Sequence, residues 1–162
     1  MSAFQPLRTC LFVGFLLVSL TAASAQSSNG LSADEQVVLD RILGSTVLFV
    51  NDTDTIPQVQ YLSDNGTGWV WTASFEDRVV PTEWAVPGRQ DGKAVFCFQF
   101  AAKDVGLPSD LPVCDFLDKI GQGILDETEG DVFDLAGTTE RAMKLPFDLS
   151  SLDALESERA AQ

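Results

Sequence analysis

The chain contains no histidine and only 3 cysteines among its 162 residues. Histidine is the side chain best suited to proton transfer near neutral pH, and it is the commonest metal ligand in proteins. Its absence excludes catalytic sites of the Ser-His-Asp and Cys-His types, and it removes the usual nitrogen ligands of zinc.

Motifs for cofactor chemistry are missing as well. There is no Gly-x-Ser-x-Gly nucleophile motif, no phosphate loop ending in Lys-Ser/Thr and no dinucleotide fingerprint. Paired carboxylates can still catalyse glycoside hydrolysis, and Glu76, Asp77 and Glu83 lie near tryptophans in the sequence. Strand alternation, however, puts Glu83 on the face opposite Trp84. We therefore predict that the protein is not an enzyme and uses no cofactor.

Acidic residues gather in two segments that could offer oxygen ligands to calcium. These residues are Asn51, Asp52 and Asp54 in the first segment, and Asp126, Glu127, Glu129, Asp131 and Asp134 in the second. Neither segment has the EF-hand spacing, and Gly130 is misplaced for that loop. Solvated acidic loops are the better interpretation, and we predict no metal site.

Positive charge is scarce, with 10 Lys and Arg against 24 Asp and Glu and a formal net charge of −14. Nucleic-acid binding needs clustered basic residues, and so does attachment to an anionic membrane surface. The composition therefore argues against both partners and favours a solvated acidic surface.

The apolar run at residues 10–20 is too short to cross a bilayer. Arg8 precedes it, and Ala23-Ser24-Ala25 follows with the small-x-small pattern of a signal-peptidase site. We interpret residues 1–25 as a cleaved secretory signal, so that the mature chain begins at Gln26 in the periplasm or outside the cell. A membrane anchor is the alternative, and the short run and its polar flank argue against it.

Signal cleavage leaves two cysteines, Cys97 and Cys114. In an exported protein such a pair predicts one disulfide. A redox-active pair is the alternative, but the spacing is far from Cys-x-x-Cys and no basic side chain closely flanks either sulfur. We predict a structural disulfide, worth about 3 kcal/mol by the entropy of closing its loop.

The mature chain has the length of one domain, which we place at residues 26–148, followed by a polar C-terminal tail at 149–162. Its first element is an amphipathic helix. Ser32 and Glu35 have the spacing of a capping box, and Gly44 is positioned to end the helix.

Short alternating segments separated by turn residues predict antiparallel strands. We expect them at residues 46–50, 57–62, 67–75, 78–86 and 93–100. Residues 113–120 fit a strand or a helix, further strands are expected at 131–135 and 142–147, and a frayed helix is expected to start near Ser150.

The strand at 93–100 carries Phe96, Phe98 and Phe100 on one face and Cys97 on the other. We expect this wall of rings to face the tryptophan side of residues 67–75 and Trp84. The predicted ligand-binding residues are Trp69, Trp71, Trp84, Phe96, Phe98 and Phe100.

Together these features predict an all-β fold: a small antiparallel meander that closes into a barrel, with a short N-terminal helix and an irregular acidic C-terminal region. Closure is favoured because it removes unpaired strand edges. A β-sandwich is the alternative.

Four short motifs follow one another along the chain. They are Ile42-Leu43-Gly44, then Tyr61-Leu62-Ser63-Asp64-Asn65-Gly66, then Glu83-Trp84-Ala85-Val86, and finally Phe96-Cys97-Phe98 with Cys114. Over about residues 38–120 the chain thereby resembles small exported bacterial proteins with a lipocalin-like β-barrel, a largely uncharacterised group. The resemblance implies a fold and a compartment and no activity, and the acidic segment after Gly123 departs from it.

Two functions remain open. The first is a binding protein whose aromatic interior holds a small apolar ligand. The second is a non-enzymatic interaction or structural protein with a filled core, whose partner would be a protein of the cell envelope. The volume of the interior separates them, because a ligand-binding barrel keeps a cavity of a few hundred Å³.

Overall fold

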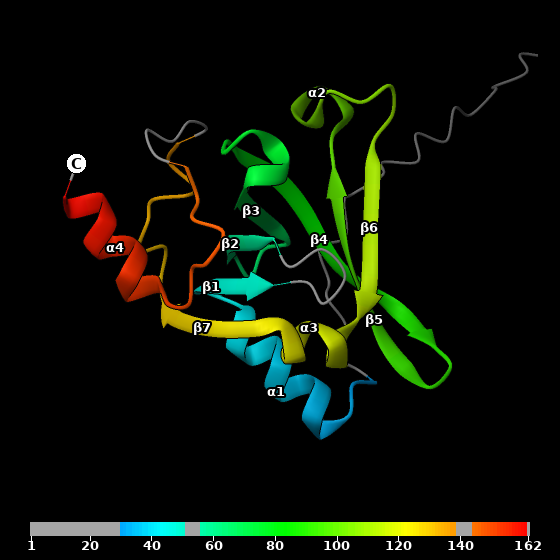
Figure 1. Ribbon diagram of the computed structural model, residues 1–162. Helices are drawn as coiled ribbons and strands as arrows, with labels where there is room; N and C mark the ends of the chain where they lie inside the picture. Colours follow the sequence, from blue (N-terminus) through cyan, green and yellow to red (C-terminus); the bar gives the residue numbers. More distant parts are fainter. Residues whose placement is uncertain (1–29, 51–55, 139–143, 162) are drawn as a thin grey trace, which may run out of the picture.

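The computed structural model describes residues 30–50, 56–138 and 144–161, so the predicted signal at 1–25 lies outside the described residues. It contains one seven-stranded sheet in the order β6-β5-β4-β3-β2-β1-β7, in which every neighbouring pair is antiparallel. The sheet is strongly bent, and helix α1 (Ala33–Ile42) lies beside it (Figure 1). The predicted antiparallel meander with a short N-terminal helix is confirmed.

The strands are β1 (Ser45–Val50), β2 (Pro57–Leu62), β3 (Thr67–Thr72), β4 (Val79–Gln90), β5 (Lys93–Phe100), β6 (Leu111–Phe116) and β7 (Ile124–Glu129). The remaining helices are the 3-10 turn η1 (Ala73–Phe75), α2 (Ala102–Val105), α3 (Leu117–Gly123) and α4 (Leu152–Ala160). No helix in the described ranges is both long enough and apolar enough to cross a membrane.

The sheet is open between its two edges, because no ladder joins β6 to β7 among the described residues. Helix α3 connects these strands and occupies the seam between them (Figure 1). Two glycines let α3 pack closely. A Cβ on Gly121 would lie 2.6 Å from a methyl group of Val38, and one on Gly123 would lie 2.7 Å from the Val50 carbonyl oxygen. The seam is therefore filled by a helix rather than by strand pairing.

Several predicted boundaries were wrong. Residues 131–135 form turns rather than a strand, and residues 144–147 form no strand, while 142 and 143 lie outside the described residues. Strand β7 was missed because its sequence, Ile-Leu-Asp-Glu-Thr-Glu, has no apolar alternation. As an edge strand it needs only one hydrogen-bonded neighbour, and charged side chains are common there.

Both faces of the sheet are buried over part of their area. The concave face carries a core that includes Leu39 and Ile42 of α1, Val80, the phenylalanines of β5, and Leu117 of α3. The opposite face carries a second core of Val59, Trp71 and Phe133 with Leu149, Leu152 and Leu155. The segment predicted as a polar tail thus contributes buried leucines, and α4 lies against this side of the molecule (Figure 1).

The register of the strands agrees with the prediction for Trp84 and corrects the predicted face of Trp69 and Trp71. Trp84 lies opposite Phe98, so both side chains point to the concave face. Val80 lies four residues before Trp84 on the same strand, so it also points to the concave face. Val70 lies opposite Val80 and shares that face. Its neighbours Trp69 and Trp71 therefore point to the other face. Alternation within β3 could not reveal this, because both of its faces carry apolar side chains.

Candidate ligand-binding site

A pocket of about 190 Å³ opens on the concave face of the sheet. Its walls come from strands at both ends of the meander, which the bend of the sheet brings together. The lining residues are Phe49, Gln58, Gln60, Thr72, Ser74, Phe75, Phe96, Phe98, Phe100, Val113, Cys114, Asp115 and Ile120.

One wall of the pocket is the row of phenylalanines on β5, which the period-two alternation of Lys93–Phe100 directs to one side. The centroids of Phe96 and Phe98 are 5.1 Å apart, and those of Phe98 and Phe100 are 5.9 Å apart. Phe75 from η1 extends the row, with its centroid 5.2 Å from that of Phe100. The rings therefore contact one another and also border an open volume.

The facing wall is polar and was not predicted. Gln58 and Gln60 point inward from β2, and the Gln60 amide donates to the Gln58 side-chain oxygen at 3.2 Å. Thr72 of β3 is buried, and its hydroxyl donates to the Pro57 carbonyl at 3.3 Å. The one signal for this wall in the sequence is the alternation of these glutamines with Val59 and Tyr61, which does not tell an internal polar face from a solvated one.

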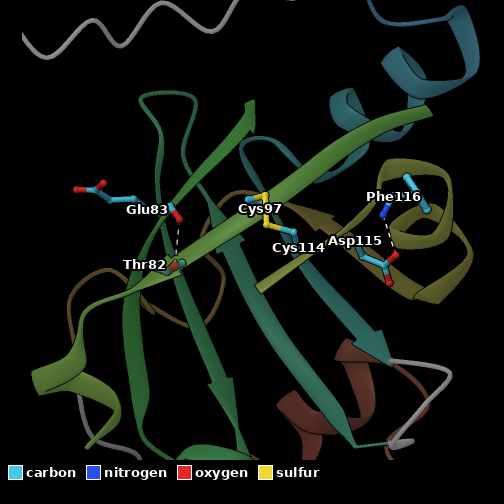
Figure 2. Close-up of a disulfide and its surroundings, with 6 residues drawn as sticks. All are labelled: Thr82, Glu83, Cys97, Cys114, Asp115 and Phe116. Atoms are coloured by element: carbon cyan, nitrogen blue, oxygen red, sulfur yellow. Dashed lines mark hydrogen bonds between the residues drawn. A yellow bond between two sulfur atoms is a disulfide. The ribbon is translucent and has the colours of Figure 1, made fainter. Parts of the chain in front are cut away.

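Strand β6 closes the side of the pocket with Val113 and Asp115, which lie opposite Phe98 and Phe96 in the ladder. The predicted disulfide is confirmed: the Cys97 and Cys114 sulfurs are 2.12 Å apart. Figure 2 shows the bridge joining β5 to β6. Because Cys97 alternates with the phenylalanines, the bridge fixes β6 in place from the face opposite the rings.

The six residues predicted as ligand-binding fall into three groups. Phe96, Phe98 and Phe100 line the pocket. Trp84 is buried behind them, stacked on Phe96 with centroids 5.6 Å apart. Trp69 and Trp71 pack with the core on the opposite face, so the structure does not bring them to the pocket.

Trp84 has a structural role that its spacing alone did not reveal. Its indole N–H lies 2.9 Å from the Ser63 carbonyl and 3.1 Å from the Thr67 carbonyl, and its backbone N–H donates to Gly66 at 2.8 Å. The indole hydrogen bonds thus join the β2–β3 hairpin to β4, and the indole ring packs against Phe96 of the phenylalanine wall.

Glu35 is a second buried polar residue whose full role was missed. It completes the predicted capping box of α1, and it also accepts the Ala94 backbone N–H at 2.7 Å and pairs with the Arg89 guanidinium at 2.8 Å. The Arg89 hydrogen bond, followed by those from Ser32 and Ala94, lowers the pKa of Glu35 to about 2. This carboxylate fastens α1 to the β4–β5 hairpin.

Two other hollows are less suited to holding a ligand. One of about 540 Å³ lies between α1, α3 and the β4–β5 hairpin, where Glu35–Arg89 and Lys93–Asp118 are paired with each other. The other, of about 370 Å³, is an open groove on the outer face beside Trp69 and Glu83. The Glu83 carboxylate points away from the sheet there (Figure 2).

The second acidic segment has structural partners. Asp126 accepts the Leu152 N–H at 2.8 Å at the start of α4, and Asp131 accepts the Leu135 and Ala136 N–H groups at 2.7 and 2.8 Å. Glu127 pairs with Arg41 at 2.7 Å. In the described residues no three potential ligands gather to hold a metal ion, and Asn51, Asp52 and Asp54 lie outside that part of the chain.

Comparison of the chain with protein-family models, curated proteins and solved structures finds no match.

Proposed function

We propose that the protein is a non-enzymatic, exported binding protein whose small ligand occupies the pocket on the concave face. The observation that carries this proposal is the open volume of about 190 Å³ bordered by Phe96, Phe98 and Phe100. Pockets of this kind combine aromatic walls with a few polar groups that orient a ligand. Here the glutamines of β2 and Thr72 supply those polar groups.

The volume restricts the ligand to a small molecule. A closed apolar cavity of about 150 Å³ is large enough to bind benzene. We therefore expect a ligand with one ring, or with an aliphatic body of similar size, and a polar group directed toward β2 or β6.

Export and a lipocalin-like architecture belong to the same proposal. The pattern of residues 1–25 supports secretion, and a disulfide is typical of periplasmic or extracellular proteins. The bent meander with α3 in its seam supports an incomplete barrel, in which a helix replaces the last strand pairing.

Isothermal titration calorimetry with benzyl alcohol, a neutral single-ring probe, tests the proposal. Val113→Trp should fill the pocket, because Val113 lies opposite Phe98, lines the pocket and is 46% exposed. We expect the wild type to bind and Val113→Trp to lose at least about tenfold in affinity, a change of about 1.4 kcal/mol. Val37→Trp is the matched control, because Val37 is 58% exposed on α1, outside the pocket.

A filled-core interaction protein of the cell envelope is the second candidate. It is favoured by the contacts between the rings and by a volume smaller than that of most ligand sites. A folded wild-type protein that binds no single-ring probe, and that carries no added mass in native mass spectrometry after purification from its source, would support this candidate over the first.

A further inference from the structure

The pocket has an uneven chemical composition. Aromatic rings come from five phenylalanines: Phe49, Phe75, Phe96, Phe98 and Phe100. The only ionisable side chain among the described lining residues is the Asp115 carboxylate, and neither lysine nor arginine lines the pocket. The neutral polar groups are amides and hydroxyls, which can accept hydrogen bonds.

Asp115 is positioned to act on a molecule in the pocket. It lies opposite Phe96 in the β5–β6 ladder, and paired residues of an antiparallel ladder share a face. It is half-buried, and its Oδ1 accepts the Phe116 N–H at 2.7 Å (Figure 2). For Oδ2 no hydrogen-bond partner is found within the described part of the chain.

One cation approaches Asp115 from outside the pocket. Lys119 Nζ lies 3.8 Å from Oδ1, and its side chain is 50% exposed. An exposed pair at this separation is worth about 0–1 kcal/mol, because water screens it and both side chains lose freedom. Lys119 therefore leaves most of the negative potential of Asp115 available to a ligand.

We propose that the ligand of this pocket is a small organic cation, an ammonium group on an aromatic or aliphatic body. This inference rests on the proposed binding function. The faces of aromatic rings carry negative potential and attract a cation within about 6 Å of their centroids. The described lining residues provide such a site, because they combine phenylalanine rings with one carboxylate and include no basic side chain. An anion would meet repulsion from Asp115, and none of these residues would offset it.

The net charge of the whole chain also favours a cationic ligand over an anionic one. With a formal net charge of −14, the protein attracts cations from a distance and repels anions. This contribution is not specific to the pocket and weakens with salt, since the screening length is about 8 Å at physiological ionic strength. The test must therefore separate Asp115 from the general charge.

Three probes of nearly equal size make this separation by calorimetry at neutral pH and physiological salt: benzylammonium, benzyl alcohol and benzoate. We expect benzylammonium to bind about 5- to 30-fold more tightly than benzyl alcohol, and benzoate to bind weakest. Asp115→Asn should remove most of this preference while the affinity for benzyl alcohol stays within about twofold, because Asn keeps the acceptor for the Phe116 N–H. Glu83→Gln, which removes one charge from the outer face, should keep the preference.

Each outcome decides a separate point. Benzyl alcohol binding as tightly as benzylammonium to the wild type overturns the cation proposal and leaves the binding function standing. A preference for benzylammonium that Glu83→Gln reduces as much as Asp115→Asn also overturns it, because the preference then comes from general charge. Binding of none of the probes overturns the binding function itself. If Asp115→Asn fails to fold, a wild type without a preference for benzylammonium still overturns the proposal, and so does a preference that Glu83→Gln removes.

Discussion

Glu35 joins three parts of the molecule through one carboxylate. It caps α1 with Ser32, accepts the Ala94 N–H on β5 and pairs with Arg89 on β4. Hydrogen bonds to a charged group contribute more than neutral ones, about 1.5–3 kcal/mol. The pairing also explains why a glutamate that is only 7% exposed remains charged.

Glu35→Gln should lower the free energy of unfolding by about 2 kcal/mol at pH 7, because Gln keeps the shape and loses the charge. Asp34→Asn is the matched control: Asp34 is in the same helical turn and exposed, so its effect should stay within a few tenths of a kcal/mol. Urea denaturation of the three proteins gives both values. Equal losses for the two variants would contradict the role of Glu35.

The lowered pKa of Glu35 makes its contribution depend on pH. Its pKa falls from 4.5 to about 2 on folding, so the unfolded chain takes up the proton first as the pH decreases. The stabilisation is complete above about pH 4.5 and is lost as the pH falls toward 2. The stability difference between wild type and Glu35→Gln should shrink over that interval, and a difference independent of pH would contradict this assignment.

Only the local contacts of Glu35 could be predicted from the sequence. The capping box joins residues three positions apart and was predicted. The bonds from Glu35 to Arg89 and Ala94 join residues 54 and 59 positions apart, and only the register of β4 and β5 brings them together. The hydrogen bonds from the Trp84 indole to Ser63 and Thr67 were missed for the same reason.

Among the elements, α4 has a larger role than its polar sequence suggests. It begins beside Asp126 and buries Leu152 and Leu155 against the outer core. Leu155→Ala should lower the free energy of unfolding by about 2–5 kcal/mol, because Leu155 is fully buried. Glu156→Ala, an exposed neighbour, is the control. A change below about 0.5 kcal/mol for Leu155→Ala would show that α4 does not pack as described.

The disulfide stabilises the edge strand β6, which forms part of the pocket. Replacing both Cys97 and Cys114 by alanine should cost about 3 kcal/mol of stability. It should also weaken the binding of benzyl alcohol, since Val113 and Asp115 of β6 would be held less firmly. Calorimetry of the folded double variant measures the second effect. Unchanged affinity would mean that pairing with β5 alone fixes the pocket wall.

Elements with strong alternation were predicted well, and the others were not. Strand β5 matches its predicted range, 93–100, because its buried Ala94, Phe96, Phe98 and Phe100 alternate with the less buried residues between them. Residues 113–120 remained ambiguous because they contain the end of β6 and the start of α3. Strand β7 has an acidic sequence that fits a loop equally well, and its pairing with β1 joins residues as distant in the sequence as Ser45 and Glu129.

At the scale of the whole molecule, both open edges of the sheet are protected. On β6 the Asp115 side chain accepts the Phe116 N–H, and on β7 the Asp126 side chain accepts the Glu127 N–H at 2.9 Å. Pro112 has no N–H to offer on β6. Such devices discourage pairing with strands of other molecules. We predict a monomer in light scattering at all accessible concentrations; a concentration-dependent dimer would contradict this.

Half of the pocket could be predicted from the sequence. The phenylalanine wall follows from alternation within one strand. The polar wall on β2 and β3 lies opposite the phenylalanines of β5 only because the sheet is bent. No local pattern in the sequence specifies that bend. Trp69 and Trp71 were assigned to the wrong face because β3 is apolar on both sides. Among the described residues, those at 133–135 and 145–155 cover its second apolar face.

A crystal structure of the protein soaked with benzylammonium tests the proposed site most directly. We predict electron density for one ring among Phe96, Phe98 and Phe100, with the ammonium group directed toward Asp115. Crystals of Val113→Trp should show the indole in that place and no ligand. A wild-type pocket that stays empty at saturating benzylammonium, or density only on the outer face, would contradict the assignment of this pocket as the ligand site.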